Sequence, residues 1–156
     1  MEIKDSVILP LPIEHVWAEL NNPETLQQAI PGCQELHQDS PTELAAVVKL
    51  KIGPVSATFK GQVQLTDLNP PHSYVISGSG TGGVAGGATG SAHVTLEEIE
   101  NGTQTCLHYE VDAAVTGKIA QLGSRLILST AKKLAGAFFA NFVSLLTPQD
   151  ETAEEK

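Results

Sequence analysis

The chain has 156 residues, which is enough for one domain with a single core. Hydrophobic residues make up 41% of the chain but aromatic residues only 4%, so we expect a mostly aliphatic interior with many small side chains. The formal net charge of −9 argues against a nucleic-acid-binding protein, because such proteins need a basic surface for phosphates.

The N-terminal segment does not have the pattern of a secretion signal. "MEIKDSVIL" is charged, and its apolar run is too short for a signal peptide. No run approaches the roughly 18 apolar residues of a membrane span. We therefore expect a cytoplasmic protein in which Cys33 and Cys106 are free thiols.

The first third of the chain predicts one strand and two short helices. "IKDSVIL" alternates weakly and is typical of a strand. "LPIEHVWAEL" follows as a helix whose first turn is favoured by Pro12. "NPETLQQAI" predicts a second short helix that ends at Pro31-Gly32.

Residues 43–80 predict three strands with one apolar and one polar face. Apolar and polar residues alternate through "ELAAVVKL" and again through "VSATFKGQVQL", with Gly53-Pro54 between them. After the loop "DLNPPHS", the segment "YVISGSG" continues as the next strand. This pattern indicates an antiparallel sheet with one buried face.

Asn101-Gly102 is the clearest hairpin signal, since this pair favours a two-residue type I′ turn. Such a turn pairs positions whose numbers sum to 203. Three apolar pairs then share one face: Leu96 with Leu107, Val94 with Tyr109, and Ala92 with Val111. The polar face pairs Thr95 with His108 and His93 with Glu110.

From Gly117 the apolar spacing changes to the three- and four-residue steps of a helix that ends before Pro148. About 30 residues would make it about 45 Å long. The predicted fold class is α+β: a curved antiparallel sheet of about seven strands around a long C-terminal helix, with two short helices after strand 1. We expect one domain over residues 1–147 and a disordered acidic tail over 148–156.

The stretch "SGSGTGGVAGGATGS" at 77–91 contains the dinucleotide-binding spacing G-x-G-x-x-G. That site requires a helix directly after the glycines, whereas strand alternation resumes at "AHVTL". We therefore interpret the glycines as a bare inward patch, with Gly86-Gly87 at the turn. The patch would either admit the long helix at Ala120 and Gly123 or form the mouth of a cavity.

His93, Glu110 and His108 could together bind a metal, but they lie on the wet face of the sheet with no enclosing loop. We expect a cross-strand ion pair and no metal. Cys33 follows "IPG" in a turn, with no base placed beside it by the sequence, and we expect a structural cysteine. No catalytic residue is predicted.

A basic stripe marks the C-terminal helix. Lys118, Arg125 and Lys132 are spaced by seven residues and so share one helical face, with Lys133 beside Lys132. An ordinary solvated face is one interpretation. The other is a surface for anionic lipid headgroups or an acidic partner, in which each basic residue contributes around 1 kcal/mol.

The apolar inner face is the remaining candidate site. It is either plain core or the wall of a cavity for a ligand. The residues assigned to it are Trp17, Leu50, Ala57, Phe59, Gly61, Tyr74, Ile76, Gly78, Gly80, Val94, Leu96, Tyr109, Val111, Leu122, Leu126 and Phe138.

Four segments together resemble the CoxG family of carbon monoxide dehydrogenase subunits. They are "IPGC" at 30–33, "VKLKIGPVSATFKGQVQLTDLNPPHSY" at 48–74, "GSAHVTL" at 90–96, and "GKIAQLGSRLI" with "AKKLAGAFFANF" within 117–142. The resemblance implies a helix-grip fold of the polyketide cyclase, START and birch-pollen-allergen-like group, with a cavity between sheet and helix. Some members continue into a hydrophobic C-terminal anchor, whereas this sequence ends in "DETAEEK", a departure from the family pattern that argues against permanent anchoring unless the chain is truncated.

The resemblance also implies a function. Members accompany molybdenum-containing carbon monoxide dehydrogenases or related hydroxylases. We therefore expect a non-enzymatic accessory protein that carries a lipid or quinone, needs no other cofactor, and contacts the inner membrane face peripherally. The alternatives are a ligand-free module that tethers or matures the dehydrogenase, and a cyclase- or hydrolase-type enzyme that uses the same cavity.

Overall fold

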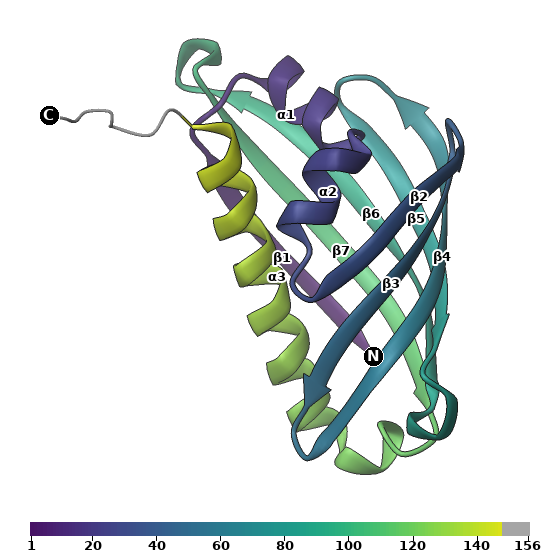
Figure 1. Cartoon of the computed structure of the whole chain (residues 1–156). Helices are drawn as coiled ribbons and strands as arrows, with labels where there is room; N and C mark the ends of the chain where they lie inside the picture. Colours follow the sequence, from purple (N-terminus) through teal and green to yellow (C-terminus); the bar gives the residue numbers. More distant parts are fainter. Residues whose placement is uncertain (148–156) are drawn as a thin grey trace, which may run out of the picture.

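The computed structural model describes residues 1–147, so the predicted tail at 148–156 lies outside the described residues. The chain forms seven strands and three α-helices in the predicted order (Figure 1). Three short 3₁₀ turns, η1, η2 and η3, join some of these elements. The elements are β1 (Glu2–Leu9), α1 (Ile13–Leu20), α2 (Pro23–Ala29), β2 (Cys33–Ser40), β3 (Glu43–Ile52), β4 (Val55–Asn69), β5 (Ser73–Thr81), η1 (Gly83–Ala85), β6 (Gly87–Ile99), η2 (Glu100–Gly102), β7 (Gln104–Thr116), η3 (Ala120–Leu122) and α3 (Ser124–Leu146).

The strands form one antiparallel sheet in the order β1-β7-β6-β5-β4-β3-β2. The sheet curves around α3, and α1 and α2 close one end of the curve (Figure 1). This arrangement confirms the predicted α+β helix-grip class. β1 and β2 are the two edges of the sheet.

The register of the β6–β7 hairpin is the predicted one: Leu96 lies opposite Leu107, and His93 opposite Glu110. Asn101 and Gly102 have φ of 56° and 84°, as a type I′ turn requires. The expected His93–Glu110 ion pair is wrong. Among residues 1–147, His108 rather than His93 contacts a carboxylate on this hairpin: its Nε2 lies 3.1 Å from Glu97 Oε1.

The core is concentrated at the end of the sheet that α1 and α2 cover. Its largest fully buried side chains include Leu9, Val16, Leu107 and Phe142, each at most 2% exposed. α2 begins with Pro23 after Asn22, whose side chain accepts a hydrogen bond from the Glu24 amide at 3.1 Å. The short helices therefore act as a lid that seals one end of the curved sheet.

α3 is shorter than predicted. It begins at Ser124 because Gly123 has a φ of +90°, which no helical residue adopts, and η3 precedes it as a separate turn. Its 23 residues span about 35 Å. Lys118 therefore lies outside the helix, and only Arg125 and Lys132 of the proposed seven-residue stripe share its face.

The prediction that no segment is apolar enough to span a membrane also requires a correction. By length and composition, Ser124–Leu146 is apolar enough to cross a membrane, although core helices of many globular domains pass the same test. Only 11% of the most apolar 18-residue segment of this helix is buried. In α3, Ile127 near one end and Phe142 near the other are the buried residues. The helix is thus held at its ends and only half covered between them.

Phe142→Ala is expected to lower the free energy of unfolding by about 3–5 kcal/mol, because it removes a ring that is 0% exposed and anchors α3. Leu145→Ala, at a side chain 42% exposed on the same helix, should cost less than about 1 kcal/mol. Urea unfolding of both variants measures the difference. Equal losses would show that Phe142 is not the anchor.

Candidate functional site

A cavity of about 370 Å³ lies between the concave face of the sheet and α3; we call it the inner cavity. Aliphatic and aromatic side chains dominate its wall, as in a site for an apolar ligand. Its lining residues are Leu20, Asn21, Leu26, Ile30, Leu36, Gln38, Leu44, Ala46, Val63, Leu65, Tyr74, Ile76, Ala92, Val94, Leu107, Tyr109, Val111, Ala135, Phe138 and Phe139.

Six residues assigned to a ligand cavity from the sequence line the inner cavity: Tyr74, Ile76, Val94, Tyr109, Val111 and Phe138. The other ten lie elsewhere. Trp17 packs edge-to-face on Tyr74 with ring centroids 5.1 Å apart, and Leu96 is buried core. Gly78 and Gly80 line a second hollow, described below. None of the remaining six lines the inner cavity: Leu50, Ala57, Phe59, Gly61, Leu122 and Leu126.

Sequence reasoning missed the wall that α1, α2 and β2 contribute. Leu20, Leu26, Ile30 and Leu36 close the inner cavity on that side. The available signal is the apolar spacing of the two short helices, which the inner-face assignment leaves out. No sequence pattern indicates Ala135, which faces the inner cavity from α3.

Tyr74 is the buried polar group of the inner cavity. Its side chain is 4% exposed, and burial raises the pKa of its phenol well above the ordinary value. Among the residues that the structure describes, its hydroxyl has no hydrogen-bond partner. A buried unpaired hydroxyl costs about 1–3 kcal/mol, so this group favours a ligand that brings a hydrogen-bonding oxygen.

Tyr109 and Phe139 form the wall of the inner cavity beside β1. Their ring centroids are 5.7 Å apart, and both residues also line a hollow on the outer side, between β1 and α3. Burial raises the pKa of the Tyr109 phenol, and the negative charge of Asp5 raises it further. This aromatic pair is thus the partition between the inner cavity and that side of the molecule.

A second hollow of about 310 Å³, the glycine trough, continues the inner cavity along β5 and β6. The two share Ile76, Ala92 and Val111. A Cβ built at Gly80 would have within 4 Å only the Lys60 carbonyl oxygen at 3.5 Å and Gly61 Cα at 3.7 Å. No atom of α3 lies there, so Gly80 leaves open space rather than admitting the helix. At Gly82 the space is taken by the Phe59 ring, since a Cβ would lie 2.6 Å from Phe59 Cε1.

The turn beyond the trough differs from the expected Gly86-Gly87 pair. Residues Gly82 to Gly86 form it, closed by the Gly82 amide that donates to the Gly86 carbonyl at 2.8 Å, and Gly87 already belongs to β6. Gly86 has a φ of +109°, and a Cβ there would lie 1.9 Å from the Thr116 carbonyl oxygen. Only glycine fits this position.

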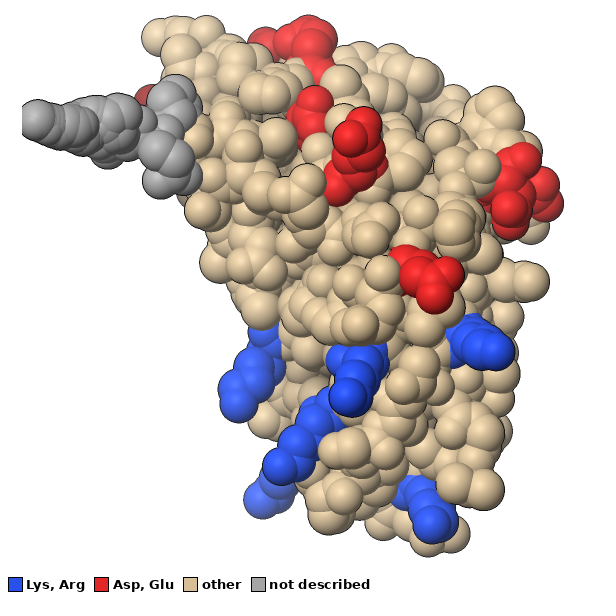
Figure 2. All heavy atoms as spheres, viewed as in Figure 1, with Lys and Arg blue, Asp and Glu red and all other residues tan. Residues whose placement is uncertain are grey.

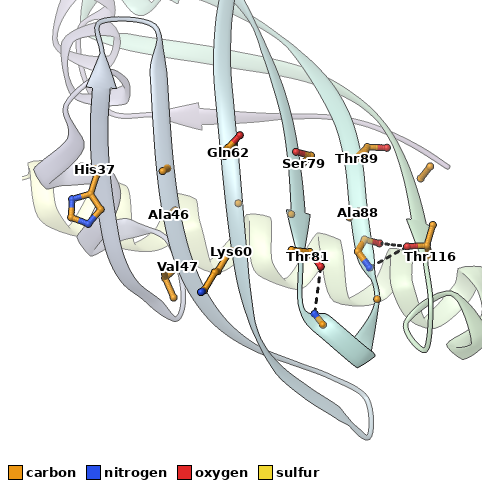
Figure 3. Close-up of a pocket in the computed structure, with 17 residues that line it drawn as sticks. His37, Ala46, Val47, Lys60, Gln62, Ser79, Thr81, Ala88, Thr89 and Thr116 are labelled. Carbon is orange, nitrogen blue, oxygen red and sulfur yellow. Dashed lines mark hydrogen bonds between the residues drawn. The ribbon is translucent and has the colours of Figure 1, made fainter.

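A larger hollow of about 750 Å³ lies on the outer face of the sheet, opposite α3 (Figure 3). Lys60, Gln62, Ser79, Thr89 and Thr116 point into it from four strands, over a floor of glycine and alanine backbone (Figure 3). It is a broad depression in a solvated polar face. We favour the inner cavity as the site, because it removes an apolar ligand from water and the outer depression does not.

On one face of the molecule, basic and acidic side chains are separated. On the face shown in Figure 2, the Lys and Arg side chains lie in the lower half and the Asp and Glu side chains in the upper half. The lower end carries η1, η3 and the β3–β4 turn (Figure 1). The cations next to these elements in the chain or in the sheet register, which we call the basic end, are Lys51, Lys60, Lys118 and Arg125.

An exposed apolar side chain lies at the same end. Val84 in η1 is 85% exposed, while its neighbour Ala85 is buried and accepts a hydrogen bond from the Ile119 amide at 3.0 Å. η1 and η3 are therefore joined. The exposed Val84 side chain is thus carried on a turn that is fixed to the segment before α3.

The sequence of residues 7–147 matches the profile of CoxG, a family of carbon monoxide dehydrogenase subunits. The chain belongs to this family. The match includes every strand and helix, except the first residues of β1. The comparison with curated proteins gives no match.

Solved structures share the helix-grip fold. A conserved protein from Geobacillus kaustophilus is 28% identical with a TM-score of 0.87, covering 92% of this chain and 93% of its own. Zhui aromatase/cyclase from Streptomyces sp. R1128 is 10% identical with a TM-score of 0.66, covering 92% of both chains. A START superfamily protein from Mycobacterium smegmatis is 16% identical with a TM-score of 0.65, covering 94% of this chain and 99% of its own.

The inner cavity of this CoxG family member contains little acid–base chemistry. Of its lining residues, only Tyr74 and Tyr109 are titratable, and the pKa of each is raised. Both phenols stay protonated at neutral pH. They can donate a hydrogen bond to a ligand oxygen, but a general base needs a pKa near the working pH.

Alkaline titration tests the burial of these phenols. In Tyr109→Phe, Tyr74 is the one remaining tyrosine, and its phenolate absorbance should appear only well above pH 10, but near pH 10 in urea. Burial raises the pKa of the Tyr74 phenol in the folded protein above its value in the unfolded chain. The protonated phenol therefore contributes its full stability to the fold below pH 10, and this contribution is lost as pH rises through the folded pKa. A native titration near pH 10 would contradict the burial of Tyr74.

Proposed function

We propose that this chain is a non-enzymatic accessory protein that carries an apolar ligand in the inner cavity. The ligand is a lipid or quinone, and the protein serves a molybdenum-containing carbon monoxide dehydrogenase or related hydroxylase at the membrane face. The observation that carries the proposal is an apolar cavity with one buried, unpartnered hydroxyl among the described residues, that of Tyr74, in a CoxG family member.

The chemistry of the wall selects the ligand class. Burying apolar surface against this wall supplies about 25 cal/mol per Å². One hydrogen bond to the Tyr74 phenol would then orient an oxygen at the closed end of the cavity, beneath α1. A quinone carbonyl, or the oxygen of a lipid headgroup, meets both requirements.

The scarcity of acid–base groups favours a carrier over a cyclase or hydrolase. The aromatase/cyclase among the similar structures shares the fold at 10% identity. That likeness shows the fold alone, and it does not extend to chemistry. A tethering or maturation module with no ligand remains the alternative, and it predicts that filling the inner cavity changes nothing.

Ala135→Leu tests the carrier function, because the larger side chain projects from α3 into the inner cavity while keeping a strong helix former. Native mass spectrometry and organic extraction should recover less co-purified lipid or quinone than from wild type, by about tenfold or more. Ala137→Leu, two residues along and outside the cavity wall, should retain the ligand.

Tyr74→Phe complements this test. It should leave the free protein at least as stable and weaken quinone binding by about five- to tenfold, the loss of one hydrogen bond. If no apolar molecule co-purifies or binds the wild type at micromolar concentration, the carrier proposal fails and the tethering module is favoured.

The basic end is the surface that we assign to the membrane. Lys118 precedes η3 and Arg125 lies in the first turn of α3, next to the joined η1 and η3 loops. The glycine trough runs along β5 and β6 toward η1, the turn that joins these two strands. The proposed ligand path and the basic end therefore share one side of the molecule. An anionic leaflet attracts basic residues by about 1 kcal/mol each.

Charge reversal of the pair Lys118→Glu and Arg125→Glu should reduce co-sedimentation with phosphatidylglycerol vesicles by more than about tenfold, since about 2 kcal/mol of attraction is replaced by repulsion. Lys4→Glu, on β1 and outside the basic end, is the control. Wild-type binding should also weaken as salt is raised. Equal binding to neutral phosphatidylcholine vesicles would contradict this assignment.

A further inference from the structure

A thiol, an imidazole and a carboxylate converge on the outer face of the β6–β7 hairpin. Glu97 lies directly opposite Cys106, and His108 is the next residue of β7 on that face. One ligand atom from each of the three lies within 4.8 Å of the others. His108 Nε2 and Glu97 Oε1 are already 3.1 Å apart.

This spacing is close to what a tetrahedral cation requires. Ligand atoms about 2.0–2.3 Å from Zn²⁺ lie roughly 3.3–3.8 Å from one another at tetrahedral angles. The pair at 3.1 Å therefore fits with a slight opening, and the thiol needs a small side-chain rotation. All three groups lie on one face of a long ladder, so the backbone positions them before any ion arrives.

We propose that Glu97, Cys106 and His108 form a surface site for one divalent cation of the Zn²⁺ class, with three protein ligands and an open fourth position. The thiolate and imidazole select borderline and soft ions over Mg²⁺ and Ca²⁺. The open position would accept water or a donor from a docked partner. The site lies on the face opposite the inner cavity and is independent of the carrier function.

β2 provides an internal comparison. Cys33, Glu35 and His37 are the same three residue types, and His37 Nε2 lies 3.3 Å from Glu35 Oε1. These residues follow one another along a single strand, where four residues span about 13 Å. The thiol therefore cannot share an ion with the imidazole. The two sets have the same composition, and only the set on β6 and β7 has the required geometry.

Cobalt(II) titration of the full chain tests the site, because a thiolate bound to Co²⁺ gives a charge-transfer band that carboxylate and imidazole ligands do not. We expect the band to saturate at one equivalent and to be displaced by Zn²⁺. Cys106→Ser should abolish it, while Cys33→Ser should keep it. His108→Ala should weaken Co²⁺ binding by at least about tenfold, and His37→Ala should leave it unchanged.

The side chains of Glu97 and His108 are 61% and 47% exposed, so these substitutions should keep the fold, which thermal unfolding checks. If Cys106→Ser fails to fold, the loss of Co²⁺ affinity in Glu97→Gln and His108→Ala decides the matter. Absence of a thiolate band in wild type, or its loss in Cys33→Ser instead of Cys106→Ser, would overturn the proposal.

Discussion

The attachment of α3 at its two ends is the constraint on which the rest of the structure depends. At one end Phe142 is fully buried and stacks on Phe138, with ring centroids 5.8 Å apart, while Asn141 donates to the Ala29 carbonyl of α2 at 3.1 Å. At the other end Leu126 covers Gly53 in the β3–β4 turn, where a Cβ would lie 2.7 Å from Leu126 Cδ2. Because both ends are fixed, the middle of the helix spans the sheet without descending onto it.

The side chains beneath that span determine how much space remains. Ala46 and Ala92 from the sheet and Ala135 from the helix face the inner cavity, where larger residues would fill it. α3 is apolar, yet little of it is buried. This exposure of apolar surface would be unfavourable if the space between sheet and helix were a filled core. It is understandable over a cavity, because the apolar surface that the sheet does not cover is then available to a ligand.

The sequence predicts the sheet better than the cavity, and the reason is physical. Strand alternation has a period of two, so the face of Tyr74 or Val94 follows from its position alone. Alternation does not tell how far along the strand the helix crosses, and the prediction therefore places Phe59 and Leu50 on the right face at the wrong height. The predicted helix start is wrong because apolar spacing runs through Gly123, whose positive φ ends the regular pattern. Residues opposite in register need not bond, and His108 reaches the diagonal Glu97 instead of its partner Thr95.

The glycines of β5 and of the turn that leads into β6 have two separate explanations. Gly86 is required by its backbone, since the Thr116 carbonyl occupies the place of a side chain. Gly80 has no such requirement, and a glycine in a strand costs about 0.5–1 kcal/mol relative to alanine. What it leaves open is the trough that continues the inner cavity. Under the proposed carrier function, this trough offers further space to a ligand that has one end at Tyr74 and is larger than the 370 Å³ of the inner cavity. Such a route would let an elongated apolar molecule enter or leave while Phe142 and Leu126 stay in place, without release of either attachment of α3.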